Sequence, residues 1–287
     1  MNINLVKIGT LGVMAAVLFF VFFKIKSESI LIAGFEKEVL ENVLKITGVT
    51  YDGTIDDLVK QTQKAWIRPA GKERWEMEEI SEDKRHELMP LFGKLGLVDE
   101  CKSTKKSYEY ILFMGGTVSR MALRMETLKE LLVSEVQYQN IVFLSGCRYL
   151  TDNEKQFLSD KKWDPIATTE FGIYPKLFEE YQIPVNKIVA INAPETVRSN
   201  GTTYRPTTAD TVECWLQTNP LPGSVVIISS QPFCHYQKIV TESLLPSSFA
   251  VSVVGVESPA DTIVANYLDT IARTLYQWVS VTLKKNK

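Results

Sequence analysis

The sequence predicts an α/β protein with a mostly parallel, doubly wound sheet, an N-terminal helical region and a single N-terminal transmembrane helix. Three observations carry this prediction. From residue 106 onward, short apolar runs alternate with helical patterns, which is typical of a parallel sheet covered by helices. The chain also opens on an uncharged apolar stretch, and the residues between these two parts have helical periodicity without strand patterns.

The apolar stretch at the start of the chain, Ile8–Phe23, has sixteen residues and no charged side chain. A helix needs about 20 residues to cross a bilayer, and residues 5–25 reach that length if Lys7 and Lys24 extend to the interfaces. No small-residue cleavage site follows, so we expect residues 1–26 to form an uncleaved membrane anchor. The alternatives are a cleaved signal peptide and a buried core helix, although a core helix should show a polar face, which this run lacks.

A single span would place the whole body of the protein on one side of a membrane. Lysines flank the apolar stretch at both ends, so the positive-inside rule gives little orientation. We favour the periplasmic or another extracytoplasmic side, and the cytoplasmic side stays open.

Residues 27–105 are expected to form a helical region that packs on the sheet. Their apolar spacing predicts a first helix that runs on from the anchor until Gly48. Thr54 is followed by two acidic residues, which is an N-cap signal for a second helix, and Ser81 is the same signal for a third.

Residues 106–287 are expected to form one α/β domain, because buried parallel strands read as short continuous apolar runs. The predicted strands are Tyr110–Met114, Ile141–Leu144, Lys187–Ile191, Val225–Ser229 and Phe249–Val254. The predicted helices are Ser119–Val136, Asn153–Lys161, Thr207–Gln217, one from about His235, and Asp261–Leu283. The carboxyl ends of parallel strands meet at one edge of a sheet, so polar turns that follow these strands predict one site.

The bulk composition argues against a nucleic-acid partner and against a metal site. A formal net charge of −2 gives no reason to expect nucleic acid as a partner. The four cysteines form no C-x-x-C pair and the chain has only two histidines, so we expect free thiols and no metal site.

The first predicted strand ends in Gly115 and Gly116, and the helix after it carries Arg120 and Arg124 one turn apart. Glycines let a ligand approach the backbone, a helix start attracts anions, and the arginines would add charge-assisted hydrogen bonds. The turn matches neither the dinucleotide-binding glycine fingerprint nor a Walker A loop, so the cofactor is unknown. The alternative is a tight turn beside two surface arginines.

Three further turns repeat this design with serine, threonine and arginine. They contribute the other candidate ligand-binding residues, Ser145, Gly146, Glu154, Arg205, Thr208, Thr211, Ser229 and Ser230. His235 is the only histidine in a predicted site, and with Glu213 it is a candidate for catalytic proton transfer; a structural hydrogen bond is the alternative. Cys147 has no histidine near it in the sequence and is expected to be inert.

We expect these turns to converge on one cleft, with Gly116, Ser145, Thr208, Thr211, Ser230 and His235 at its centre. A small anionic ligand is expected there, because arginines stand beside glycine and hydroxyl turns. The alternative is a neutral network in which the arginines pair with Glu154, Glu170 and Glu213.

Taken together, the turns resemble the YdcF/SanA-like family over about residues 108–255. The glycine-rich turn with its arginines and the Ser-Gly turn with its following glutamate match that family's first two elements. The third and fourth elements are matched by Thr208, Thr211 and Glu213, with Asp210 and Cys214 in place of two Asn, and by Ser229, Ser230 and His235, with Lys238 in place of Arg. The resemblance implies a Rossmann-like α/β domain, often tethered by one N-terminal span, and envelope-related roles suggested for some members.

Three functions compete at this stage. The first is a membrane-anchored protein that binds or processes a phosphorylated, nucleotide-like or lipid-linked envelope metabolite. The second is a non-catalytic module for envelope binding or assembly, which would bind a ligand without turnover. The third is an anchored protein with a nucleotide-type cofactor such as S-adenosylmethionine, which the missing glycine fingerprint disfavours.

Overall fold

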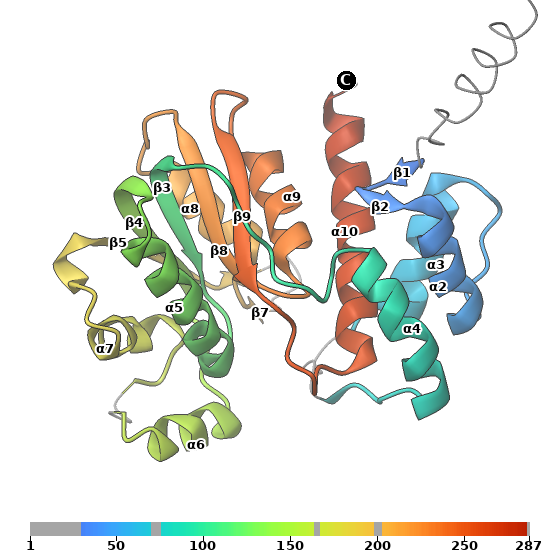
Figure 1. The fold of residues 1–287 in the computed structure, drawn as a ribbon, viewed down its shortest axis with the longest axis horizontal. Helices are drawn as coiled ribbons and strands as arrows, with labels where there is room; N and C mark the ends of the chain where they lie inside the picture. Colours follow the sequence, from blue (N-terminus) through green and yellow to red (C-terminus); the bar gives the residue numbers. More distant parts are fainter. Residues whose placement is uncertain (1–29, 70–75, 164–166, 198–202, 286–287) are drawn as a thin grey trace, which may run out of the picture.

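The computed structural model describes residues 30–69, 76–163, 167–197 and 203–285. At its centre is a sheet of five parallel strands in the order β5-β4-β3-β8-β9 (Figure 1). The first of these strands in the chain lies in the middle of the sheet. The chain adds two strands on one side of it and then crosses to the other side. The bounds are β3 (Ser107–Met114), β4 (Gln137–Gly146), β5 (Ile188–Ala193), β8 (Ser224–Ser230) and β9 (Ala250–Val256).

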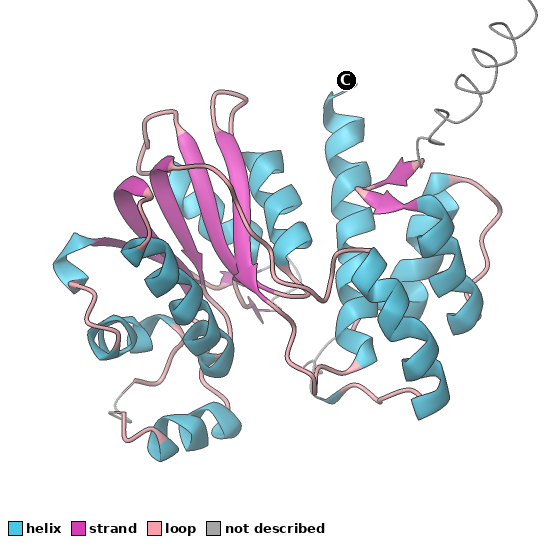
Figure 2. Cartoon of the chain, viewed as in Figure 1, coloured by secondary structure: helices cyan, strands magenta, loops and turns pink. Residues whose placement is uncertain are grey.

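Helices cover both faces of this sheet and give three layers (Figure 2). One face packs on α5 (Val118–Val133), α6 (Asp152–Asp160) and α7 (Tyr174–Glu180). The other face packs on α8 (Thr208–Leu216) and α9 (Cys234–Leu244).

The central strand β3 has an apolar sequence without alternation because both of its faces are buried. Ile111 and Phe113 belong to the core on the α5 face, whereas Leu112 and Met114 belong to the core on the α8 face. Successive side chains of a strand point to opposite faces, and here both faces are buried.

The predicted α/β fold with a parallel sheet is confirmed, and each predicted strand is present. The ends of the predicted helices in this part differ from the observed ones by one to three residues.

Short elements complete the description of the fold. They are the hairpins β1 (Leu31–Ile32) with β2 (Phe35–Glu36) and β6 (Thr196–Val197) with β7 (Thr203–Tyr204), and the 3-10 turns η2 (Phe171–Ile173) and η3 (Val185–Lys187).

A second core lies in a helical unit beside the sheet. It is built by α2 (Lys37–Thr47), α3 (Ile55–Trp66), α4 (Glu82–Lys94) and α10 (Val264–Lys285). Helix α10 packs on α3 and also on α9, so it is the helix of this unit that lies next to the sheet layers (Figure 1). The last helix, which the sequence groups with the α/β domain, therefore gives its buried residues to the core of the helical unit.

The prediction that a helix runs on from the anchor to Gly48 is wrong for its first described residues. The β1–β2 hairpin occupies residues 31–36, and α2 begins only at Lys37. The chain reverses at Ala33 and Gly34, which have φ angles of 54° and 83°, and the left-handed backbone region cannot continue a right-handed helix.

The start of α3 follows its sequence signal. The side chain of Thr54 accepts a hydrogen bond from the N–H of Asp57 at 3.2 Å, as expected for an N-cap.

Across the residues that the structure describes, no helix is both long and apolar enough to span a bilayer. The predicted anchor, residues 5–25, lies outside those residues.

Leu275→Ala tests whether α10 is part of the helical core. The Leu275 side chain is fully buried, so its truncation leaves a cavity, and we expect the free energy of unfolding to fall by about 2–5 kcal/mol. Its neighbour Tyr276 is 55% exposed, so Tyr276→Ala is the control and should change the value by about 0.5 kcal/mol or less. Urea unfolding measures both; equal effects would show that α10 is not packed as described.

Candidate functional site

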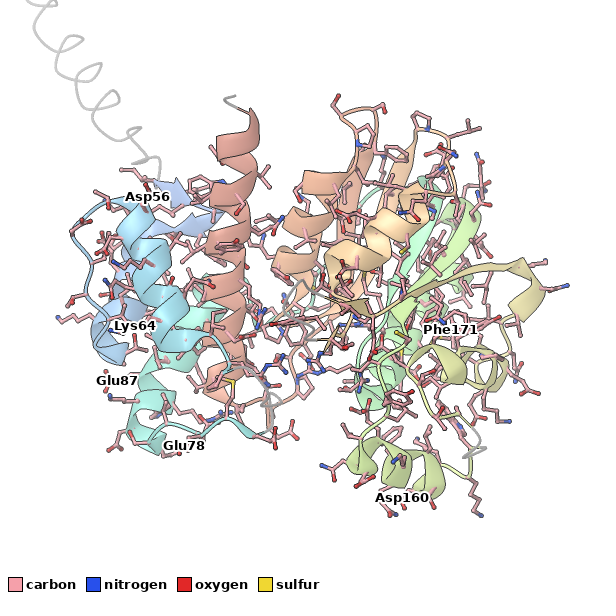
Figure 3. All side chains as sticks on the ribbon, turned by 180° about the vertical axis from the view of Figure 1, so that it is seen from behind. Asp56, Lys64, Glu78, Glu87, Asp160 and Phe171 are labelled. Carbon is pink, nitrogen blue, oxygen red and sulfur yellow. The ribbon has the colours of Figure 1, made fainter. Side chains whose placement is uncertain are left out.

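A cavity of about 960 Å³ opens at the carboxyl ends of the strands, between the sheet layers and α10. Its walls include the turn after β3, the first residues of α5 and α8, the turns that lead into α9 and α10, and Arg68 from the end of α3. Side chains of both units reach into the space between α10 and the sheet (Figure 3). The lining is rich in bases: Arg68, Arg120, Arg124, Arg148, Lys161, Arg205 and Arg273 line it, against Glu126, Glu170 and Asp261.

Arg124 ties together the two strands at which the strand order reverses. Its side chain comes from the buried stripe of α5 and is only 2% exposed. Nη1 donates to the carbonyl oxygens of Met114 and Gly115 at the end of β3, and Nε donates to Ser230 Oγ at the end of β8, 3.3 Å away. Open α/β sheets bind ligands at this reversal point, so Arg124 marks the expected place for a site.

Arg148, in the turn after β4, is paired with two carboxylates. Nη1 and Nη2 donate to the two oxygens of Glu154 at 2.7 Å each, and Nε donates to Glu170 Oε2 at 2.9 Å. Burial opposes the charge of Arg148, but the two carboxylates outweigh it and raise the pKa of the guanidinium. The pKa of Glu154 is lowered, because the bonds from Arg148 and Thr151 outweigh its burial, whereas burial raises the pKa of Glu170.

Carboxylates already occupy the starts of three helices around the cavity. Glu154 accepts from the N–H of Val118 at the start of α5, and Glu79 accepts from the N–H of Val264 at the start of α10. Asp210 forms a capping box with Thr207 at the start of α8. The helix ends are therefore largely compensated, and the positive character of the cavity comes from its arginines.

Arg120 differs from Arg148 in its partners. Its Nη1 donates to the carbonyl oxygen of Gln231 at 2.8 Å, and its guanidinium lies 5.2 Å from the ring centroid of Phe233. No carboxylate of the described residues forms an ion pair with it. Burial lowers the pKa of Arg120, opposed by the more distant charges of Tyr267 and Asp261. Arg120 is thus a partly desolvated cation at the cavity wall that has a carbonyl, and not a carboxylate, as hydrogen-bond partner.

The structure separates the predicted ligand-binding residues into two groups. Those that line the cavity are Gly115, Gly116, Arg120, Arg124, Gly146, Arg205, Thr208 and Thr211. The others are buried behind its wall: Ser145 donates to Glu170, Ser229 to Gln237, Ser230 accepts from Arg124, and Glu154 holds Arg148. The second group supports the wall and does not touch the space inside it.

The two candidate catalytic residues do not line the cavity. Glu213 is exposed on α8. His235 Nε2 donates to the carbonyl oxygen of Ala33 at 2.6 Å, and its ring meets Phe35 edge-on, so His235 holds the β1–β2 hairpin against α9. A Cβ at Gly34 would lie 2.6 Å from the His235 ring, which explains why glycine stands in this turn.

Several lining residues escaped the sequence reasoning. Arg148 stands beside the predicted Ser-Gly turn, and its strand-end position is the signal that could have found it. Arg68, Asn266 and Arg273 belong to the helical unit, far from any predicted turn in the sequence, and only the packing of α10 brings them to the site.

Comparison with protein-family models, with curated proteins and with solved structures returns no match. The resemblance to the YdcF/SanA-like family therefore stays a prediction.

Arg148→Met should destabilise the protein by about 3–5 kcal/mol, because it leaves Glu154 and Glu170 as unpaired carboxylates next to each other in a buried site. The matched control is Lys155→Met, which breaks an exposed pair with Asp152 and should cost less than about 1 kcal/mol. Urea unfolding compares the two variants. Similar losses would mean that the Arg148 cluster is solvated and does not hold the cavity wall.

The protein should lose stability on mild acidification through His235. Burial lowers its pKa below the ordinary 6.5, so the unfolded chain binds the proton more readily than the folded one. The stabilisation is complete above about pH 6.5 and is lost as the pH falls through the folded pKa. His235→Gln should flatten the dependence of the unfolding free energy on pH between about pH 7.5 and 5.5, as measured by urea unfolding at a series of pH values. An unchanged slope in His235→Gln would contradict the docking role.

Proposed function

We propose that this protein binds a phosphorylated small molecule that also carries hydroxyl or amino groups, such as a sugar phosphate or a nucleotide. The ligand would occupy the cavity between the strand ends and α10. A volume of about 960 Å³ is at the upper end of the range for small-molecule sites, which supports a ligand larger than a single phosphate.

The state of Arg120 is the observation that carries this proposal. A guanidinium that has lost part of its hydration without gaining a carboxylate is better stabilised when an anion binds to it. Guanidinium N–H groups match phosphate oxygens in pairs, and Arg120 has donors beyond the one bonded to Gln231. The neighbouring basic side chains of the lining add to the same electrostatic attraction.

Asn266 supports the presence of a hydrogen-bond donor in the ligand. It lies in the first turn of α10 and lines the cavity, and its Oδ1 is buried with no hydrogen-bond partner among the described residues. A buried acceptor without a partner costs about 1–3 kcal/mol, which a ligand hydroxyl or amino group would recover. The phosphate group of a monoester is largely without a proton at neutral pH, so the donor has to come from the rest of the ligand, and a sugar offers hydroxyl groups.

Binding and turnover remain two outcomes of the same proposal. Turnover is favoured by one observation: Glu170 lines the cavity and burial raises its pKa, as in carboxyl groups that act as general acids. Binding without turnover is favoured by His235, because its Nε2 is hydrogen-bonded to Ala33 in the β1–β2 hairpin and does not face the cavity. Release of inorganic phosphate from the bound ligand would identify an enzyme, and recovery of intact ligand would identify the non-catalytic module. The envelope role and the membrane anchor stay predictions.

Arg120→Gln should weaken binding of AMP or a hexose phosphate by about tenfold or more, because one charge-assisted hydrogen bond contributes about 1.5–3 kcal/mol. Lys187→Gln removes an equal charge from an exposed position outside the cavity and should bind as the wild type does. Titration calorimetry measures both variants. Equal affinities for the two variants, or no heat with wild-type protein at millimolar ligand, would rule out an anion site at Arg120.

Asn266→Ala separates the two halves of the ligand in the same titrations. Loss of the acceptor should weaken binding of the hexose phosphate and leave unchanged the affinity for inorganic sulfate, an anion that has no proton to donate at neutral pH. A parallel loss for both ligands would place the anionic group, and not the hydroxyl groups, at α10.

A further inference from the structure

Two cysteines that are far apart in the sequence meet at the end of β9. Cys101 lies in the segment between α4 and β3, and Cys234 is the first residue of α9. Cys101 and Gly255 exchange two backbone hydrogen bonds, of 2.8 and 3.0 Å, as an antiparallel pair. Residues opposed in this way point their side chains to the same face, so the Cys101 side chain stands on the face of Gly255 where a Cβ would project.

The missing side chain of Gly255 makes room for the second thiol. A Cβ on Gly255 would lie 2.5 Å from Cys234 Sγ, so this sulfur occupies the space beside Cys101 that any other residue would fill. The side-chain amide of Gln231 faces the same place, with its Nε2 at 3.9 Å from Cys101 Sγ. The Cys101 and Cys234 side chains therefore approach each other on this face of β9.

The two thiols have unequal surroundings. Cys234 is fully buried, whereas Cys101 is half-buried. The neighbouring Cys234 thiol, supported by the charge of Lys238 and opposed by burial, lowers the pKa of Cys101 to about 7. The neighbouring Cys101 thiol and burial raise the pKa of Cys234. Cys101 is therefore the thiol that ionises more readily.

We propose that Cys101 and Cys234 form a redox-active dithiol whose substrate is a small-molecule disulfide such as oxidised glutathione. The Cys101 thiolate attacks one sulfur of that disulfide, which forms a mixed disulfide and releases one thiolate. Cys234 Sγ then attacks Cys101 Sγ, the second thiol leaves with the proton of Cys234, and the protein disulfide remains. Two electrons pass from the pair to the external disulfide, which is reduced to two thiols.

This dithiol is separate from the anion site, because neither cysteine lines the cavity. The other two cysteines, Cys147 and Cys214, serve as internal controls. Burial and the charges of Asp210 and Glu213 raise the pKa of Cys214, which disfavours its thiolate.

The test is peptide mapping of the full chain, without reduction, after incubation with oxidised glutathione. Wild-type protein should yield a Cys101–Cys234 peptide pair that is lighter by two hydrogen atoms. Cys234→Ser should instead accumulate glutathione on Cys101, and Cys101→Ser should leave Cys234 unmodified, while Cys147→Ser and Cys214→Ser should form the bond as the wild type does.

Mapping of the wild type decides the proposal even if a variant fails to fold. Glutathione that persists on Cys101 of the wild type, or a Cys101 that stays reduced while Cys147 or Cys214 reacts, would overturn it. A circular-dichroism spectrum equal to that of the reduced wild type is required of each variant before its map is interpreted.

Discussion

The burial of Arg124 is the constraint on which the candidate site depends. A guanidinium that is 2% exposed has to find acceptors for its N–H groups, and the ends of β3 and β8 offer two carbonyl oxygens and a hydroxyl oxygen. These bonds fix the two strand ends at the reversal point of the sheet. The same guanidinium places a positive charge at the floor of the cavity, so one side chain both holds the strand ends together and contributes to the charge of the candidate site.

The hydrogen-bond partners of an arginine in the cavity wall determine whether it has a structural or a ligand-binding role. Arg148 lies between Glu154 and Glu170 and joins α5, α6 and the turn after β4 into a wall, with its charge already compensated. Arg120 meets a carbonyl oxygen and an aromatic ring, neither of which compensates a full charge. Arg148 therefore stabilises the wall, whereas Arg120 keeps a positive charge that an anionic ligand can neutralise.

Helix α10 explains why the cavity has two walls of different chemistry. Its buried stripe belongs to the core of the helical unit, and its packing on α9 brings its first turns over the strand ends. The sheet side contributes Arg120 and the glycine turns, whereas α10 contributes Asn266 Oδ1, an acceptor that has no hydrogen-bond partner among the described residues. A ligand that satisfies both walls needs an anionic group and a hydrogen-bond donor.

By itself, the sequence determined the strands, the parallel sheet and the edge at which polar turns gather, because these follow from local apolar runs such as Ile111–Met114 and from turn chemistry such as Gly115-Gly116. The tertiary structure decided which polar side chains face the cavity. Ser145, Ser230 and His235 sit in the predicted turns yet bond to Glu170, Arg124 and Ala33, since a turn only places a side chain near an edge and its partners come from elsewhere in the chain. Asn266 and Arg273 reach the site only because distant helices share one core, which no local pattern encodes.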